Sequence, residues 1–346
     1  MKTNLFGFTP NKLSEVASSL GLPAFTANQL ADWLYKKRVT SFAAMTNLSK
    51  QAREKLERKY LLDLTAPSKV QTSMDGTKKY LYPTQTEKFI ESAYIPDADR
   101  ATLCVSTQIG CKMGCLFCMT GKQGFQGNLS AGDILNQVQS LPEFEQLTNI
   151  VYMGMGEPLD NVEAVLDSIE IMTSDKGYAW SPKRITVSTI GIIPAMITFL
   201  ENSQAHLAVS LHSPFDDERR EIMPIQSVYP ITEVIREIRR WNLGRQRRIS
   251  FEYIMFKGVN DTPRHAAELV KLLNGIKCRI NLIRFHPIPD TPLEGTSYDN
   301  IVTFQNLLKA KGLTVTIRAS RGEDIFAACG MLSTKELVKK QQETDF

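Results

Sequence analysis

Six short apolar runs, rich in β-branched residues, follow one another along the second part of the chain. Stretches with apolar residues at helical spacing separate them, as in ITEVIREIRRW (231–241) and PRHAAELVKLL (263–273). Strands that alternate with helices of this length predict parallel βα units wound as a full or partial barrel. The six runs are NIVYMGM (149–155), RITVSTI (184–190), HLAVSLH (206–212), ISFEYIM (249–255), RINLIRF (279–285) and TVTIRAS (314–320).

The first part of the chain has a different pattern. TPNKLSEVASSL (9–20) begins behind a threonine cap, and TANQLADWLYKKR (26–38) has apolar residues at helical spacing. Further on, KFIESAYIP (88–96) is typical of a strand bounded by turn residues. The predicted division is a helical accessory domain at 1–65, a β-rich linker at 66–100, the barrel at 101–335 and a polar tail at 336–346.

The composition is typical of a soluble globular enzyme, with 346 residues of which 42% are hydrophobic and 23% charged. No apolar run approaches the roughly 18 residues of a membrane span, and the first residues lack the apolar core of a signal peptide. We therefore expect a cytoplasmic protein without a membrane partner. In a reducing compartment its six cysteines favour metal or redox chemistry over structural disulfides.

Positive charge is concentrated at the front of the chain. Residues 1–90 contain 14 Lys or Arg and 7 Asp or Glu, although the net charge of the whole chain is only +4. The segment SKQAREKLERKY (49–60) gathers many of these cations on a predicted helix, which suits a polyanion such as RNA. The alternative is a solvated helix face with i,i+4 ion pairs. A second Arg-rich stretch, 236–248, is a further candidate contact or a solvated helix end.

Four of the cysteines occur within CVSTQIGCKMGCLFC (104–118). Cys111, Cys115 and Cys118 form C-x3-C-x2-C, which places three thiols in one glycine-rich loop. An iron–sulfur cluster usually has four cysteine ligands, so three would leave one iron open to a substrate or cofactor. Structural zinc requires four closed ligands, and Cys104, the nearest fourth thiol, lies inside an apparent strand. The spacing therefore favours a redox cluster over zinc.

Polar residues recur where the predicted strands end, which is the end of such a barrel at which catalytic residues lie. Serine, histidine and glycine are common in the loops of any protein. This explains a polar residue after any one strand, but it explains less well why polar residues follow several strands. The positions are Cys111, Gly156 with Glu157, Ser188, His212, His286 and the segment 321–329.

At the first strand of a barrel, C-x3-C-x2-C resembles the motif of the radical S-adenosylmethionine (SAM) superfamily. Within it, the chain resembles the RlmN/Cfr family of RNA adenine methyltransferases from about residue 10 to 335. The resemblance implies a partial (β/α)6 radical SAM barrel. The stretches that carry it are QLADWLYKKRVTSFAAMTNLSK, YIPDADRATLCVSTQIGC, YMGMGEPLDN, SLHSPFDDERREIMPI, GVND and RGEDIFAACG.

The resemblance also implies cofactors and their ligands. Cys111, Cys115 and Cys118 match the ligands of a [4Fe-4S] cluster whose fourth iron binds SAM, and two SAM molecules are used per turnover. His286 precedes Pro287 where the family commonly has an Asn–Pro pair, so an imidazole replaces an amide and its contact becomes dependent on protonation. The implied SAM contacts are Gly156, Glu157, Ser188, Ser210, Leu211, His212 and His286.

Three further residues match the family's catalytic groups. Carbon 2 of adenine is electron-poor, so the methyl group must arrive as a radical. In the implied scheme one SAM methylates Cys329, and a radical derived from a second SAM activates that methyl group. Glu91 then removes the ring proton as general base. Cys104 attacks the sulfur of Cys329 and frees the methylated base by thiol exchange.

The implied function is methylation of carbon 2 of an adenosine in 23S rRNA, at the peptidyl transferase centre, and of the adenosine 3′ to the anticodon in tRNA. The base must be unstacked to be reached. A reductant such as flavodoxin and a monomeric state are expected. A Cfr-type carbon-8 methyltransferase is the nearest alternative, against which Pro158 counts because Cfr-like sequences tend to have alanine there. A noncatalytic Fe–S or zinc RNA-binding protein is a remote alternative that would not need Cys329.

Overall fold

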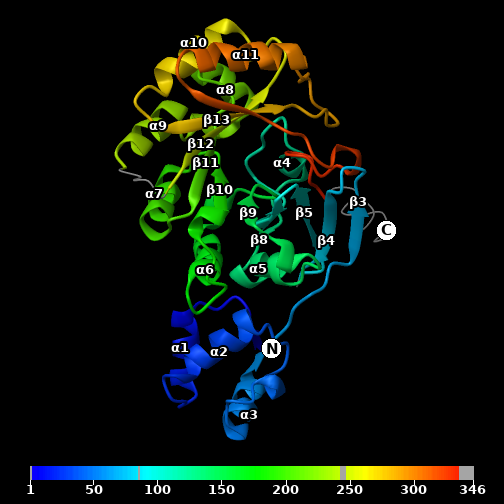
Figure 1. The fold of residues 1–346 in the computed structure, drawn as a ribbon, viewed down its shortest axis with the longest axis vertical. Helices are drawn as coiled ribbons and strands as arrows, with labels where there is room; N and C mark the ends of the chain where they lie inside the picture. Colours follow the sequence, from blue (N-terminus) through cyan, green and yellow to red (C-terminus); the bar gives the residue numbers. More distant parts are fainter. Residues whose placement is uncertain (1, 85, 242–246, 335–346) are drawn as a thin grey trace.

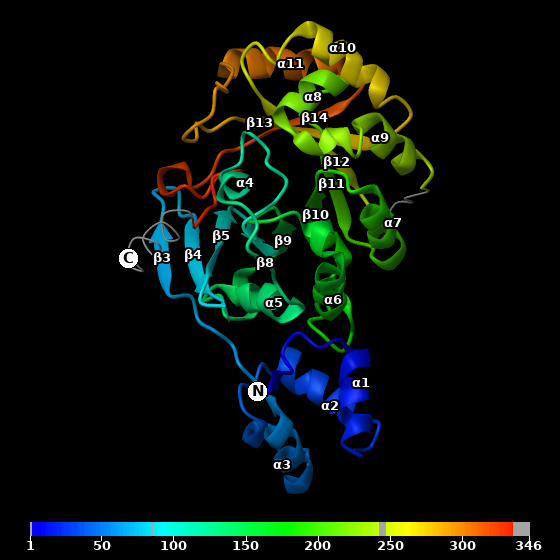
Figure 2. The same ribbon diagram turned by 180° about the vertical axis from the view of Figure 1, so that it is seen from behind.

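The computed structural model describes residues 2–84, 86–241 and 247–334. One curved sheet with helices on its outer side forms the main body, and a lobe of short helices lies beyond one end of it (Figure 1, Figure 2). The strand order of this sheet is β14-β13-β12-β11-β10-β9-β6-β5-β4-β3. None of the described helices is long and apolar enough to cross a membrane.

Seven neighbouring strands of the described sheet run parallel. The predicted partial α/β barrel is confirmed, with one parallel strand more than the six runs of the sequence analysis because β6, which precedes them, pairs parallel with β9. The parallel strands are β6 (Arg100–Cys104), β9 (Asn149–Tyr152), β10 (Ile185–Thr189), β11 (His206–Ser210), β12 (Ile249–Met255), β13 (Cys278–Arg284) and β14 (Thr314–Arg318). The helices between them are α4 (Met119–Gln123), α5 (Ala131–Gln139), α6 (Val162–Thr173), α7 (Ile193–Asn202), α8 (Asp216–Ile222), α9 (Ile231–Arg239), α10 (Pro263–Leu272) and α11 (Tyr298–Ala310).

Three antiparallel strands extend this sheet beyond β6: β5 (Phe89–Asp97), β4 (Lys78–Pro83) and β3 (Lys69–Thr72). The β-rich linker is thus continuous with the barrel through backbone hydrogen bonds. The domain boundary at residue 100 stays a prediction. A separate pair, β7 (Gln108–Ile109) and β8 (Gly127–Asn128), closes the base of the cysteine-rich loop.

The N-terminal lobe contains α1 (Pro10–Ser19), α2 (Thr26–Ala31) continued by a π-helical turn, and α3 (Lys50–Lys59). Short strands β1 (Thr3–Asn4) and β2 (Tyr60–Leu61) pair its two ends. Each long helix begins at a hydroxyl cap, because the side chains of Thr9 and Ser49 accept backbone N–H groups of the first turn. The backbone of the lobe packs directly against the barrel at Gly7, because a Cβ there would lie 2.3 Å from the backbone nitrogen of Gly132.

Side chains along the parallel strands alternate between two environments. Outward positions are apolar and fully buried: Ile150, Val187, Leu207, Phe251 and Leu282. Inward positions line a cavity inside the barrel, and they include apolar residues such as Val151 and Ile283 but also a set of polar ones: Asn149, Thr186, Ser250, Asn281 and Thr316. Interiors of closed α/β barrels are ordinarily filled by branched apolar side chains. The polar inner face of this open barrel instead leaves a space, which we call the barrel cavity.

His206 stands at the amino end of the barrel cavity. Its Nδ1 accepts a hydrogen bond of 2.9 Å from the backbone N–H of Arg248, which fixes the proton on Nε2 when the ring is neutral. Burial lowers the pKa of His206 to about 4, and the cations of Arg248 and Lys183 add to this effect. The ring is therefore neutral at pH 7.

We predict that Gly7→Ala loosens the contact between the N-terminal lobe and the barrel. The added methyl group would meet Gly132, and Gly7 has a φ of +93°, which costs a side-chain-bearing residue about 1 kcal/mol on its own. Gly21→Ala is a matched control, since Gly21 also has positive φ but no atom within 4 Å of its Cβ position. Hydrogen exchange in α1 should rise for Gly7→Ala well beyond any rise for Gly21→Ala; equal changes would mean that backbone strain alone acts.

We predict that His206 makes the fold less stable in mild acid. Its folded pKa lies below the ordinary value of 6.5, so the unfolded chain binds more protons and stability falls as the pH drops from 6.5 towards 4. Between pH 7 and pH 5 this contributes a loss of roughly 1–2 kcal/mol. Anaerobic urea unfolding of the wild type and of His206→Asn, whose amide oxygen can still accept the Arg248 N–H, measures it. A pH dependence that is the same in both proteins contradicts the prediction.

Candidate active site

The loop that follows β6 carries Cys111, Cys115 and Cys118 and folds back on itself. At Gly110 φ is +71°, and a Cβ would lie 1.7 Å from the carbonyl oxygen of Gly124, so only glycine fits. Cys111 and Cys115 are buried and Cys118 is partly exposed. All three line one cavity at the carboxyl ends of the strands, which we call the cysteine cavity.

The thiols of this loop fit an iron–sulfur cluster. Burial raises the pKa of Cys111 to about 12, and the charge of Cys118 adds to the rise. Burial and the two neighbouring thiols also raise the pKa of Cys115. Three thiolates this close together need a cationic partner. No three His, Cys, Asp or Glu side chains of the described residues converge on a single ion, whereas a cluster binds each thiolate through a different iron.

Gly156 and Glu157 follow β9 and line the cysteine cavity. Gly156 has a φ of +96°, and a Cβ there would meet Gln108 at 2.5 Å. The buried carboxylate of Glu157 accepts hydrogen bonds from Thr189 Oγ1 (2.6 Å) and from the backbone N–H groups of Ile190 and Leu159 (both 3.1 Å). Burial raises its pKa to about 7 in spite of these bonds. A carboxylate accepts about four hydrogen bonds, so one position remains for a ligand amino group.

Ser188, Ser210 and His212 also line the cysteine cavity. His212 accepts the backbone N–H of Ile254 through Nδ1 at 3.0 Å, and burial lowers its pKa to about 3, so it is a neutral donor through Nε2. Its ring packs edge-on against Phe117 of the cysteine loop, with centroids 4.8 Å apart. His212 therefore supports the loop as well as the cavity wall.

Arg219 ties together the strand ends behind these residues. Its side chain is fully buried and donates to the carbonyl oxygens of Ile190, Ser210 and Leu211, each at 3.0 Å. Burial lowers its pKa to about 10, so it stays charged at pH 7. The side chain of Leu211, an expected SAM contact, is fully buried in the apolar core and does not line either cavity.

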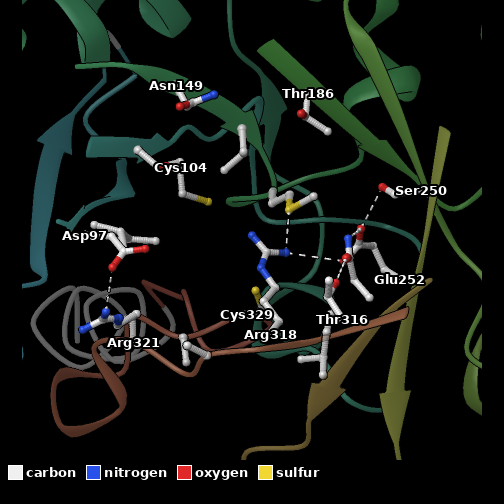
Figure 3. A pocket seen from close by; sticks show the side chains of 18 of the residues that line it. Asp97, Cys104, Asn149, Thr186, Ser250, Glu252, Thr316, Arg318, Arg321 and Cys329 are labelled. Atoms are coloured by element: carbon white, nitrogen blue, oxygen red, sulfur yellow. Dashed lines mark hydrogen bonds and ion pairs between the residues drawn. The ribbon is translucent and has the colours of Figure 1, made fainter. Parts of the chain in front are cut away.

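Cys104, which is buried, and Cys329, which is exposed, line the same cavity although 225 positions separate them in the sequence. Both line the barrel cavity, and Cys329 also lines the cysteine cavity, so the two cavities share this residue (Figure 3). Burial raises the pKa of Cys104 to about 12; the charge of Cys329 adds to the rise, and that of Arg318 opposes it. Both cysteines have free thiols.

Polar contacts hold the segment that carries Cys329. The carboxylate of Asp75, in the turn between β3 and β4, accepts the backbone N–H of Gly322 at 2.9 Å. Asp324 accepts the hydroxyl of Ser73 at 2.5 Å and the backbone N–H of Met74 at 3.2 Å. Burial alone would raise the pKa of Asp75, but its hydrogen bonds outweigh burial and lower the pKa to about 2. The β3–β4 turn thus anchors the segment against the barrel.

Glu91 lies on β5 and is not among the residues that line either cavity. Its carboxylate makes an ion pair of 3.1 Å with Lys79 and accepts the backbone N–H of Ser333 at 3.0 Å. Burial raises the pKa of Glu91, and the charge of Lys79 opposes this rise. Ser333 adjoins Leu332, which lines both cavities, so Glu91 stands one residue behind the cavity wall.

His286 lines the barrel cavity rather than the cysteine cavity. It is 4% exposed, and its Nδ1 lies 3.2 Å from Glu323 Oε1 without the alignment of a hydrogen bond. Burial lowers its pKa, and Glu323 opposes this. A SAM contact at His286 stays a prediction.

The sequence analysis did not identify two residues of the site. Arg318 and Glu252 line both cavities and lie 3.5 Å apart. Each occupies an inward position of a strand run in which apolar and polar residues alternate. That alternation was the available signal, because strands covered on both faces are ordinarily apolar throughout.

Two family models match the chain. The radical SAM superfamily matches residues 105–270, and the ribosomal RNA large subunit methyltransferase N-terminal domain matches residues 3–62. A radical SAM methyltransferase from Sphaerobacter thermophilus superposes with a TM-score of 0.87 at 39% identity, over 95% of this chain and 99% of that one. Both parts of the fold therefore occur together in a solved relative.

Relatives with named activities cover nearly the whole chain. The probable dual-specificity RNA methyltransferase RlmN of Parabacteroides distasonis is 57% identical over 337 residues, which are 97% of this chain and 98% of that protein. The dual-specificity RNA methyltransferase RlmN of Syntrophus aciditrophicus is 42% identical over 98% of this chain and 99% of that protein. The chain belongs to the RlmN family of the radical SAM superfamily.

Proposed function

We propose that the chain is an RNA methyltransferase that adds a methyl group to carbon 2 of an adenosine in 23S rRNA, at the peptidyl transferase centre, and of the adenosine 3′ to the anticodon in tRNA. One observation carries the proposal: Cys104 and Cys329 line the barrel cavity, and Cys329 reaches the cysteine cavity as well. A methyl carrier must reach both the methyl donor and the base, and a releasing thiol must reach the carrier. Relatives named as dual-specificity RNA methyltransferases support two RNA substrates.

Bound SAM, two molecules per turnover, and a [4Fe-4S] cluster would supply the methyl groups and the radical chemistry that an electron-poor carbon requires. Cys111, Cys115 and Cys118 would hold the cluster. The residues proposed to hold SAM are Gly156, Glu157, Ser188, Ser210, Leu211, His212 and His286. Of these, Gly156, Glu157, Ser188, Ser210 and His212 line the cysteine cavity beside the three thiols.

Cys329 would carry the methyl group to the base, and Cys104 would release the product. Attack of the Cys104 thiolate on the sulfur of Cys329 forms a disulfide and breaks the bond from that sulfur to the product carbon. This carbon keeps the bonding electron pair and takes up a proton. Glu91 would accept the ring proton as general base. Because Lys79 and the Ser333 N–H bind its carboxylate, one of these contacts must open first.

We predict that 2-methyladenosine forms when 23S rRNA and tRNA are incubated anaerobically with the reconstituted enzyme, SAM and a one-electron reductant such as flavodoxin. Mass spectrometry of the nucleosides measures it. Cys329→Ala should give no product, since the carrier is lost, whereas Cys278→Ala, a cysteine outside both cavities, should retain it. 8-Methyladenosine instead would assign the chain to the Cfr-type reaction. No methylated base from an enzyme with an intact cluster would overturn the proposal.

Exposed cations at two places suit the RNA phosphates. On α3 they are Lys50, Arg58 and Lys59; Arg53, also on the predicted basic face, donates to the carbonyl oxygen of Ala43 and is partly buried. At the amino end of the barrel cavity they are Arg100, Lys183 and Arg248. Such cations bind the nucleic-acid backbone irrespective of sequence. Within the Arg-rich stretch 236–248, residues 242–246 lie outside the described part.

We predict that charge reversal at Lys50, Arg58 and Lys59 to glutamate weakens RNA binding and lowers its salt dependence. Each lost phosphate contact reduces the slope of log K against log salt by about 0.7–0.9. Fluorescence anisotropy with a labelled RNA at several salt concentrations measures the slope. SAM binding should stay unchanged, because α3 lies in the lobe apart from the cysteine cavity (Figure 1). An unaltered RNA affinity would exclude α3 from the RNA-binding surface.

A further inference from the structure

Arg318 occupies the junction of the two cavities. It is the last residue of β14, and its side chain lines both the barrel cavity and the cysteine cavity. Figure 3 shows its guanidinium between the sulfur of Cys329 and the carboxylate of Glu252, with the sulfur of Cys104 across the same space. One cation therefore faces the two thiols whose chemistry the proposed function combines.

The guanidinium is held in place from the side opposite the cysteines. Its Nη1 lies 3.2 Å from the sulfur of Met153 and 3.5 Å from Glu252 Oε2. Glu252 is itself fixed, because Asn281 donates to it at 2.7 Å and Ser250 at 3.1 Å. In the part of the chain that the structure describes, both contacts of the guanidinium use Nη1. Arginine has five N–H donors, so the others can turn towards a sulfur anion.

The charges of these groups are coupled. The charge of Cys329 is the largest influence on the pKa of Arg318, which rises, and those of Glu252 and Cys104 act in the same direction. For Cys104 the effect is also seen from the other side, since the charge of Arg318 lowers the pKa of that thiol against the larger effect of burial. A thiolate at Cys104 depends on a nearby cation more than one at the exposed Cys329, because burial opposes the ionisation of Cys104.

A purely structural ion pair with Glu252 is the competing explanation. Such a pair would join β14 to β12 across β13. The contact is long for a charge-assisted hydrogen bond, which is typically about 2.7–2.9 Å, and β13 already bonds to both strands. Glu252 has two closer donors than Arg318. The geometry is thus that of a guanidinium which Glu252 orients but does not fully neutralise.

We infer that Arg318 is the positioning cation of the two reactive cysteines: from the junction of the cavities, its guanidinium stabilises a sulfur anion at Cys329, and one at Cys104 when it forms. Thiolates, not thiols, are the nucleophiles in both methyl acceptance and disulfide formation. This inference rests on the proposed function for the roles of the two cysteines, but the charge of Arg318 acts on their sulfur atoms whether or not RNA is the substrate.

The test measures the reactivity of Cys329 in the cluster-loaded enzyme under anaerobic conditions, without SAM or RNA. The thiolate displaces iodide from iodoacetamide, forming a carbon–sulfur bond, and peptide mass spectrometry gives the rate constant at pH 7.5. An opposite charge nearby shifts the balance of charged and neutral forms by about tenfold or more. Arg318→Met should therefore slow the reaction by about tenfold, and Arg318→Lys, which keeps the charge, should restore most of the rate.

Two variants separate charge from structure. Arg240→Met removes an exposed arginine that pairs only with Glu237 in the described part, and it should react at the wild-type rate. Glu252→Gln removes the ion pair but keeps Arg318, so the reaction should not slow. If Arg318→Lys and Glu252→Gln are as slow as Arg318→Met, the pair is structural and the inference is wrong. A wild-type rate in Arg318→Met with an unchanged unfolding midpoint overturns it as well.

The outcome for Arg318 is distinguishable from that for the proposed function. Formation of 2-methyladenosine that persists in Cys329→Ala would remove the carrier role of Cys329, and the alkylation rates would still report on Arg318. A normal methylation result with unchanged alkylation in Arg318→Met would remove only the inference about the cation.

Discussion

The structure depends on one constraint, the alternation of side chains along parallel strands held in register. Each outward residue packs under the helices, so each inward residue must face the barrel axis. Inward polar residues such as Thr186, Ser250 and Asn281 cannot pack as an apolar core would, and a cavity results. The same register that builds the core thereby sets the depth at which each polar group enters the cavity. Thr102 lies opposite Asn149 and Cys104 opposite Val151, so Cys104 stands two residues above the amino-end rim.

Protein groups compensate the charges at and behind the wall of the cysteine cavity. Glu157 is bound by Thr189 and two backbone N–H groups, and Arg219 by three carbonyl oxygens. His212 is uncharged at neutral pH, since burial lowers the pKa of its ring. Burial of an unpaired charge costs several kcal/mol, so these partners are required for the fold as well as for function. The thiols of Cys111 and Cys115 are the exception, because burial opposes their ionisation and an iron–sulfur cluster is the cation that matches them.

The sequence predicted the strands, the cysteine loop and part of the wall of the cysteine cavity, because these depend on local patterns: period-two runs, glycine spacing and thiol spacing. It did not predict which side chains meet across the barrel. Arg318 and Glu252 are 66 residues apart and meet only because β12, β13 and β14 pair in one register. The sequence correctly placed Glu91 on a strand. Its position behind Leu332, outside both cavities, depends on the path of the C-terminal segment and could not be predicted. Leu211 was expected to contact SAM, yet its side chain turns into the core, because neighbouring residues of an extended chain face opposite ways.

The segment that carries Cys329 is held by a different kind of interaction from the barrel. Asp75, Asp324 and Ser73 fasten it through hydrogen bonds, and Phe326 within it is 58% exposed with a φ of +53°. Each such bond contributes only about 1 kcal/mol net, whereas a buried apolar strand residue contributes roughly 1.5–3 kcal/mol. Local opening follows the weakest set of contacts. The segment that carries Cys329 can therefore open while the strands that present Cys104 and Arg318 stay closed, so the sulfur of Cys329 can move relative to a fixed thiol and a fixed cation.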